Sequence, residues 1–186
     1  MIPGEPRAGQ LLIARDPGDG SYFDRSVVLL LDHDDEGSVG VCLHQPGAQP
    51  LPPPLMELRP LLTPPAEIFE GGPVNEHAVI GLAQLRRPGS HPKGWQPLFQ
   101  DVGSLALDTP YEELDGHFSH LRIFMGLAGW GPGQLIGELL RGSWFRTPAT
   151  PEEIFATPER LWQRILRRCG GQCGLWSTWT DTPSWN

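Results

Sequence analysis

Short apolar runs separated by turn residues dominate the hydrophobic pattern of this chain. Residues 26–32 (SVVLLLD) form a continuous apolar run with β-branched side chains, which predicts a strand buried on both faces. Residues 38–44 (SVGVCLH) follow the turn sequence Asp34-Asp35-Glu36-Gly37, so the two runs together predict a β-hairpin. Similar runs predict further strands at residues 10–14, 77–84, 120–125 and 143–147, and residues 98–107 show strand-like alternation.

Helical periodicity is confined to a few short segments. Residues 158–168 place four apolar side chains on one face at helical spacing, which predicts an amphipathic helix. A second helix is predicted from about Pro132, an accepted first helical residue, to Arg141, with Gly142 ending it. One or two helical turns are expected within residues 55–62 and 111–116. Strands come first and helices later, without alternating β-α-β units, so the pattern predicts an α+β fold.

Composition supports short elements joined by many turns. The chain has 23 glycines and 21 prolines, together 44 of its 186 residues and about twice the usual share. This excludes a helical bundle, a coiled coil and a fully disordered chain. The length suits one domain over residues 1–186, in which residues 170–186 form a tail that contains cysteine and tryptophan.

The net charge and the absence of targeting patterns in the sequence argue against nucleic-acid binding, membrane insertion and secretion. The formal net charge of −8 disfavours nonspecific binding to nucleic acid, because affinity for phosphate depends on Lys and Arg. No apolar run approaches the roughly eighteen residues of a transmembrane helix, and the start lacks the pattern of a secretory signal. Three cysteines suit a reducing compartment. We therefore expect a cytoplasmic protein that does not bind membranes.

The most unusual local feature is a glycine-rich junction between a strand and a helix at residues 126–134. Such a loop before a helix N-terminus can bind an anion through free backbone N–H groups. The spacing is neither GxGxxG nor a P-loop, and Pro132 removes one donor. The alternative is structural: the glycines let Trp130 fold under the helix, and Gln134 caps backbone groups.

Three other segments carry residue types used in chemistry, each with a plainer alternative. The acidic cluster Asp32–Glu36, which includes His33, could hold a divalent cation, but a hairpin loop is where solvated charges normally lie. Cys169 and Cys173 could form a reversible disulfide or be incidental thiols. The last predicted helix carries four arginines, which form either a patch for nucleic acid or an acidic partner, or a solvated face: Arg160, Arg164, Arg167 and Arg168.

Four segments together resemble the YqgE/AlgH family, also called UPF0301 or DUF179. They are residues 9–14 (GQLLIA), residues 23–40 from FDRSVVLL through the hairpin to GSVG, residues 71–74 (GGPV), and residues 126–135 (GLAGWGPGQL). The resemblance implies a bacterial α+β protein with coiled and bifurcated, mostly antiparallel β-sheets packed by a few short helices. The biochemical function of the family is largely unassigned, and one branch is labelled a transcriptional regulator tied to alginate synthesis.

The chain departs from the family pattern at two positions. The family usually has Asn-Arg-Pro where this chain has His44-Gln45-Pro46, and an acid directly after Gly-Gln-Leu where this chain has Ile136. Glu138 is then the nearest acid. A ligand contact made by either family residue would be altered here.

These observations lead to three functional hypotheses. The first is a non-enzymatic regulator that acts through protein partners and uses no cofactor or metal. The second is a small-ligand-binding protein or enzyme with a cleft beside the loop at residues 129–134. The third is direct DNA binding through the arginine-bearing helix. The candidate residues for a ligand or partner are His33, Gly71, Gly72, Trp130, Gln134 and Glu138.

Overall fold

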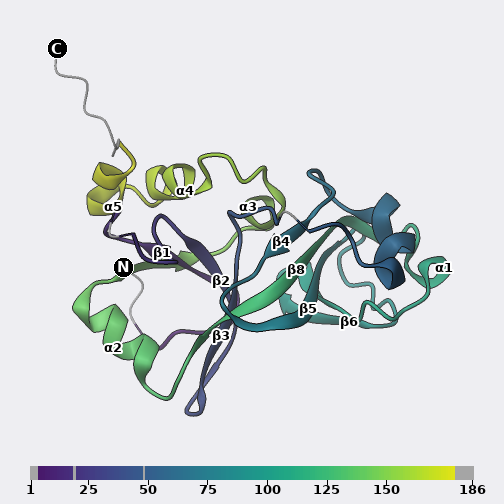
Figure 1. Cartoon of the computed structure of the whole chain (residues 1–186), viewed down its shortest axis with the longest axis horizontal. Helices are drawn as coiled ribbons and strands as arrows, with labels where there is room; N and C mark the ends of the chain where they lie inside the picture. Colours follow the sequence, from purple (N-terminus) through teal and green to yellow (C-terminus); the bar gives the residue numbers. More distant parts are fainter. Residues whose placement is uncertain (1–3, 19, 48, 179–186) are drawn as a thin grey trace.

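The computed structural model describes residues 4–18, 20–47 and 49–178, which form a bent nine-stranded sheet with short helices (Figure 1). The strands are β1 (Gln10–Ala14), β2 (Val27–Asp34), β3 (Gly37–Cys42), β4 (Ile68–Glu70), β5 (Val74–Leu85), β6 (Trp95–Phe99), β7 (Val102–Leu105), β8 (Phe118–Trp130) and β9 (Trp144–Pro148). The helices are the 3₁₀ helix η1 (Pro53–Leu61) and the α-helices α1 (Tyr111–Leu114), α2 (Gln134–Arg141), α3 (Pro151–Phe155), α4 (Leu161–Cys169) and α5 (Gly171–Trp176).

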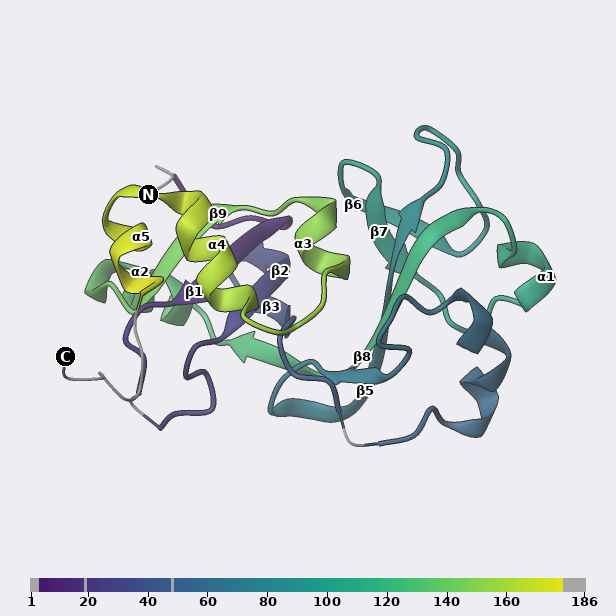
Figure 2. The same cartoon turned by 90° about the horizontal axis from the view of Figure 1, so that it is seen from above.

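The long strand β8 holds the two halves of the sheet together (Figure 2). The strand order is β6-β7-β5-β8-β3-β2-β1-β9, and all neighbours in it are antiparallel. The N-terminal part of β8 pairs with β5, and residues 123–125 also pair in parallel with β4. The C-terminal part pairs with β3 through residues 128–130. The sheet therefore divides along β8, and the expected α+β class with coiled, bifurcated sheets is confirmed.

β1, the first half of β2 (Val27–Leu30) and the end of β3 are buried on both faces, whereas the tip of the hairpin, from Asp32 to Val39, is largely exposed. Leu11 and Leu29 pair across β1 and β2 and face the core beneath α4. Leu12 and Val28, the next pair, face the opposite core, which Trp130 helps to form. Layers of helix and loop therefore cover both faces of the sheet at these strands, which need no polar face there.

The glycine-rich block differs from the expected loop. β8 continues through Gly126 and Gly129 to Trp130, and α2 starts at Gln134 rather than at Pro132. Pairing of β8 with β3 extends the strand into residues that look like a loop from the sequence alone. The predicted end of α2 is correct, because Gly142 takes the left-handed conformation that a helix C-terminus favours.

Two helices in the C-terminal region were not predicted. α3 spans five residues, too few for a periodic signal, and is stabilised by a capping box between Thr150 and Glu153. α5 lies within the expected tail, and residues 179–186 of that tail lie outside the described residues. In the described part of the chain, no helix is long and apolar enough to cross a membrane.

The largest of the fully buried side chains in the described structure belongs to an arginine. Arg122 of β8 is only 2% exposed and lies over the ring of Phe69, 4.2 Å from its centroid. Its guanidinium donates to the backbone carbonyls of Ile154, Phe155, Ala156 and Pro64 at 2.7–3.3 Å. Burial lowers its pKa to about 10, so the group stays charged at neutral pH. Arg122 thereby ties the end of α3 to the middle of the sheet.

Candidate functional site

Three of the predicted site residues, Trp130, Gln134 and Glu138, meet at α2 and form hydrogen bonds with one another. Glu138 Oε2 accepts hydrogen bonds from the indole Nε1 of Trp130 and of Trp144, each at 2.8 Å. Glu138 Oε1 accepts one from Gln134 Nε2 at 3.0 Å. Gln134 Oε1 in turn accepts the backbone N–H of Gly131 at 3.1 Å. The polar atoms of this cluster are thus used internally, which matches the structural alternative for this block.

Aromatic packing closes the same cluster. The ring of Phe23 stacks on that of Trp130, with centroids 6.2 Å apart and an interplanar angle of 20°. Trp144 meets Trp130 edge to face at a centroid distance of 6.0 Å. Both tryptophans are buried. The indole N–H groups inside this apolar layer need acceptors, and Glu138 supplies them.

Gly71 and Gly72 lie where two backbones approach closely. A Cβ on Gly71 would lie 2.2 Å from the carbonyl oxygen of Gly126. One on Gly72, whose φ is +149°, would lie 2.3 Å from the carbonyl carbon of Leu127. The Gly71 N–H donates to the carbonyl of Met125 at 2.7 Å. These glycines therefore let the chain between β4 and β5 press against β8.

His33 lies apart from this group, on the hairpin of β2 and β3. Its Nδ1 is 2.7 Å from Ser38 Oγ on the opposite strand. In the acidic turn that follows, Asp34 Oδ1 accepts the backbone N–H groups of Glu36 and Gly37. No group of three His, Cys, Asp or Glu side chains placed to hold a metal ion occurs among the described residues.

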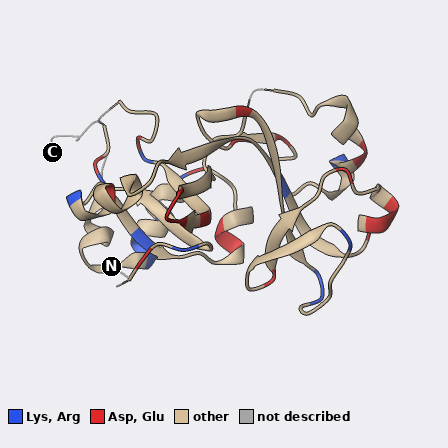
Figure 3. Cartoon of the chain, turned by 90° about the horizontal axis from the view of Figure 1, so that it is seen from below, with Lys and Arg blue, Asp and Glu red and all other residues tan. Residues whose placement is uncertain are grey.

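The arginines of the last helix are partly engaged in holding the fold. Arg168 forms an ion pair with Glu153, with Nε to Oε1 at 2.6 Å, and donates to the carbonyl of Pro148. Arg164 donates to the carbonyls of Thr157 and Glu159. Figure 3 shows Lys and Arg positions in both halves of the molecule. These contacts favour the structural interpretation of the arginine helix over a nucleic-acid patch.

Cys169 and Cys173 are free thiols at the junction of α4 and α5. Both are half-buried and pack against the core beneath α4. Burial raises the pKa of the Cys169 thiol, which keeps it protonated at neutral pH. A protonated thiol is a poor nucleophile, so burial does not activate Cys169 for redox exchange.

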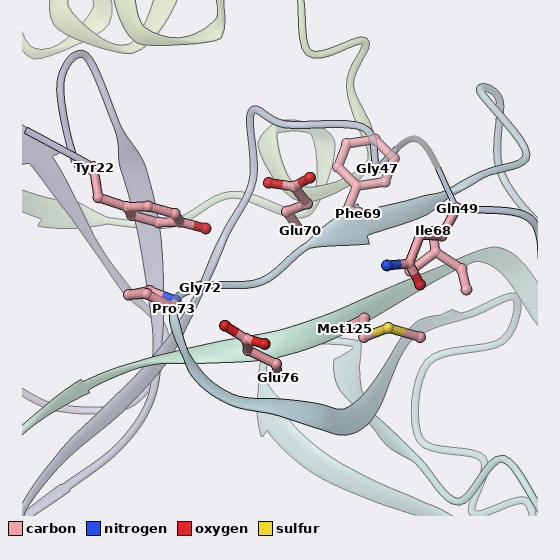
Figure 4. Close-up of a pocket in the computed structure, with 10 residues that line it drawn as sticks. All are labelled: Tyr22, Gly47, Gln49, Ile68, Phe69, Glu70, Gly72, Pro73, Glu76 and Met125. Atoms are coloured by element: carbon pink, nitrogen blue, oxygen red, sulfur yellow. The ribbon is translucent and has the colours of Figure 1, made fainter. Parts of the chain in front are cut away.

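A cavity of about 410 Å³ opens beside Gly72 (Figure 4). Four segments that are distant in sequence form its wall: the β1–β2 loop, the proline-rich connector, the stretch from β4 to the start of β5, and β8. Of the six predicted candidates, only Gly72 lines it. The lining residues are Tyr22, Gly47, Gln49, Ile68, Phe69, Glu70, Gly72, Pro73, Glu76 and Met125.

The ionisable groups of this cavity are all acidic. Among the described residues, Glu70 and Glu76 have neither a hydrogen-bond nor an ion-pair partner for their carboxylates, and no Lys, Arg or His lines the wall. Burial, with the negative field of Cys42, Glu70 and Glu76, raises the pKa of Tyr22 to about 12. Burial together with Glu70 also raises the pKa of Cys42 to about 12. The phenol and the thiol are therefore neutral at physiological pH.

The sequence analysis missed the ionisable residues of the cavity because they are distant from one another or carry no motif of their own. Tyr22 lies in a turn cluster, and Glu76 lies at an exposed strand start. Glu70 carries one usable signal, because it directly precedes Gly71-Gly72-Pro73, one of the motifs by which the chain resembles a known family. Only the folding of β4 onto β8 brings these groups together.

A family model described as AlgH-like matches residues 11–174. The chain belongs to the AlgH-like family. Its relatives include a UPF0301 protein of Streptomyces avermitilis, 40% identical over 184 residues, which cover 96% of this chain and 94% of that protein. A UPF0301 protein of Thermobifida fusca is 36% identical over 188 residues, with the same coverage of both chains.

Two solved structures share the fold of this chain. The crystal structure of a Corynebacterium diphtheriae protein superposes with a TM-score of 0.88 at 30% identity and covers 96% of this chain and 95% of that one. The solution structure of AlgH from Pseudomonas aeruginosa gives a TM-score of 0.65 at 24% identity and covers 98% and 100%. The second likeness concerns the fold alone.

This AlgH-like protein departs from the family pattern at His44 and at Ile136, and the structure shows the surroundings of both positions. Glu138 supplies the acid of the α2 cluster, while Ile136, two residues earlier, is half-buried. His44 follows β3, and among the described residues neither of its ring nitrogens has a hydrogen-bond partner. Burial lowers the pKa of His44 to about 4, so the imidazole is neutral at physiological pH.

Proposed function

We propose that this AlgH-like protein binds a small molecule in the cavity between Tyr22, Glu70 and Met125. The cavity itself carries the proposal. Its volume of about 410 Å³ lies within the range of small-molecule sites, about 300–1,000 Å³. Its wall combines apolar side chains with a few polar groups, which is the usual composition of such sites.

The cavity wall favours binding over catalysis. Among the described residues, its ionisable side chains are Tyr22, Glu70 and Glu76, and none of those that line it is a Ser, Cys or His that could form a nucleophile and base pair. The proposal therefore keeps the non-enzymatic expectation and moves the site from the loop at residues 129–134 to the cavity that Gly72 lines.

A second proposal is that the protein acts as a regulator through a protein partner in the cytoplasm. Two exposed side chains with large apolar surface support it: Tyr22, which lines the cavity, at 40% exposure, and Val74, next in sequence to the lining residue Pro73, at 48%. A partner that docks here would bind differently to the empty and the occupied cavity.

Methionine methyl NMR tests the ligand-binding proposal. The chain has three methionines, and of the two in the described residues Met125 lines the cavity while Met56 lies in η1. A screen of metabolites of mixed charge against methyl-labelled protein is expected to yield a compound that shifts the Met125 signal and leaves that of Met56 in place. The substitution Met125→Leu assigns the signal.

A steric block supplies the control. Gln49 is an exposed residue of the cavity wall, and Gln49→Trp is expected to fill the cavity and abolish the shift. Gln172→Trp places the same side chain on the exposed surface of α5 and is expected to leave binding unchanged. A screen without a Met125 response, or a ligand that binds the Gln49→Trp protein equally well, overturns the proposal.

A further inference from the structure

The charge of the cavity restricts what it can hold, if the proposed binding function is correct. Glu70 and Glu76, both exposed, bring two carboxylates to the wall, and no basic side chain lines it in the part of the chain that the structure describes. An anionic ligand would lose its hydration and meet like charges, which is unfavourable. A cationic ligand would give both carboxylates the partner that they lack among the described residues.

The groups are distributed unevenly around the cavity. In Figure 4, Tyr22, Glu70 and Glu76 surround one end, whereas Gln49, Ile68 and Met125 lie toward the other. One end is thus acidic and aromatic, and the other is mostly apolar with one amide. A matching ligand has a positive head and a hydrocarbon stem.

A divalent metal ion does not fit this wall. Hard cations such as Ca²⁺ need six to eight oxygen ligands, usually several of them carboxylates. The described residues contain no group of three His, Cys, Asp or Glu placed to hold a metal, and two carboxylates stand alone here. A bare metal ion would also make no contact with the apolar side chains at the other end of the cavity.

The aromatic wall suits an organic cation. Ammonium and guanidinium groups are attracted to the face of an aromatic ring, in addition to their pairing with carboxylates. The Tyr22 hydroxyl stays protonated at neutral pH and can both donate and accept a hydrogen bond. The side chains of Ile68 and Met125 offer apolar contact to methylene groups.

We propose that the cavity binds an organic cation, an ammonium or guanidinium group on an aliphatic stem, with its head between Glu70 and Glu76. A free polyamine and the side chain of Lys or Arg in a polypeptide share this chemistry.

Three probes with one stem test the head group. Hexylamine, hexanol and hexanoate are titrated into the protein while the Met125 methyl signal is followed. Hexylamine is expected to bind at least tenfold more tightly than the other two, and its affinity is expected to fall with added salt. Equal or tighter binding of hexanol or hexanoate overturns the inference.

Matched variants locate the charge. Glu70→Gln with Glu76→Gln is expected to weaken hexylamine binding at least tenfold. Glu57→Gln with Glu159→Gln removes the same net charge from exposed positions outside the cavity and is expected to leave the affinity unchanged. Equal melting temperatures of the two double variants exclude loss of folding as the cause. Retained affinity in the first pair overturns the inference.

Two further arms distinguish the sources of the cation. Spermidine and agmatine represent free amines, and a blocked Gly-Lys-Gly peptide, compared with its Gly-Gln-Gly counterpart, represents a side chain. Tighter binding of either class supports the organic cation and names its source. If a neutral or anionic metabolite shifts Met125 and is blocked by Gln49→Trp, the ligand-binding function stands and the cation inference alone fails.

Discussion

Trp130 and Trp144 donate their indole N–H groups to the same oxygen of Glu138, each at 2.8 Å. Trp130 ends β8, and Trp144 begins β9 at the edge of the sheet, with β3, β2 and β1 between these two strands. One carboxylate in α2 thus ties together two strands that are not neighbours. The glycine-rich block before α2 is the most specific motif of the sequence, and it supplies Trp130 to this contact.

Glu138→Gln is expected to lower the free energy of unfolding by about 1–3 kcal/mol. The amide oxygen can still accept from both indoles, but its NH₂ group then faces the NH₂ group of Gln134. Two donors then face each other at this exposed position and turn to solvent, and the two buried indole N–H groups keep a neutral acceptor in place of a charged one. Denaturant unfolding monitored by tryptophan fluorescence measures the loss.

A swap of the two side chains supplies the control. In Gln134→Glu with Glu138→Gln, the new carboxylate accepts from the new amide and from the Gly131 N–H, and the new amide oxygen accepts from both indoles. The double variant is expected to recover most of the lost stability. A double variant less stable than either single variant would contradict the described hydrogen-bond network.

Arg122→Lys is expected to destabilise the protein by about 2–4 kcal/mol. A lysine ammonium cannot replace the planar guanidinium that serves the carbonyls at the end of α3 and at Pro64. Hydrogen exchange is expected to accelerate most in α3. Arg164→Lys, at a half-buried arginine that also donates to backbone carbonyls, is expected to cost much less. Equal costs would contradict the role assigned to burial.

His44 predicts how stability depends on pH. Its pKa is about 4 in the folded protein and 6.5 ordinarily, so between these values the unfolded chain binds the proton more tightly. The free energy of unfolding should therefore fall as the pH drops from 6.5 toward 4, by at most about 3 kcal/mol from this residue. His44→Asn is expected to flatten the curve in that window. An unchanged slope would rule out a neutral buried His44 as its source.

Gly72→Ala is expected to cost more than about 3 kcal/mol or to prevent folding. The added Cβ meets the backbone of Leu127 at 2.3 Å, and the φ of +149° is itself strained for alanine. Gly116→Ala measures the cost of the backbone conformation alone, because Gly116 also has a positive φ but nothing lies within 4 Å of the added Cβ. Comparable losses in the two variants would show that the close approach at Gly72 is unimportant.

Local pattern predicted those elements whose signal is contained in the element itself. The hairpin at residues 26–44 combines two apolar runs with a turn, and the structure has it as β2 and β3. β4 has three residues and no period, and it exists because it pairs with β8 more than fifty residues later. α3 could have been found from its capping box, Thr150 with Glu153, which is visible in the sequence.

The candidate site was less predictable because a cavity is a property of packing. The glycine-rich block drew attention to Trp130, Gln134 and Glu138, which the structure does bring together, although in a closed cluster. His33 was chosen by residue type, and its partner is Ser38 on the next strand. Tyr22 and Glu76 have no local signal, since their shared environment arises only when the segments on either side of β8 fold.

The division of the sheet along β8 bears on how the molecule comes apart. Because this one strand supplies backbone partners to β5, β4 and β3, neither half can be excised with all of its hydrogen bonds intact. Unfolding of the two halves should therefore be cooperative, and a single proteolytic cut should not release an independently stable fragment. Met125 and Trp130 lie on that same strand, so occupancy of the cavity and integrity of the tryptophan cluster would be linked through one piece of backbone.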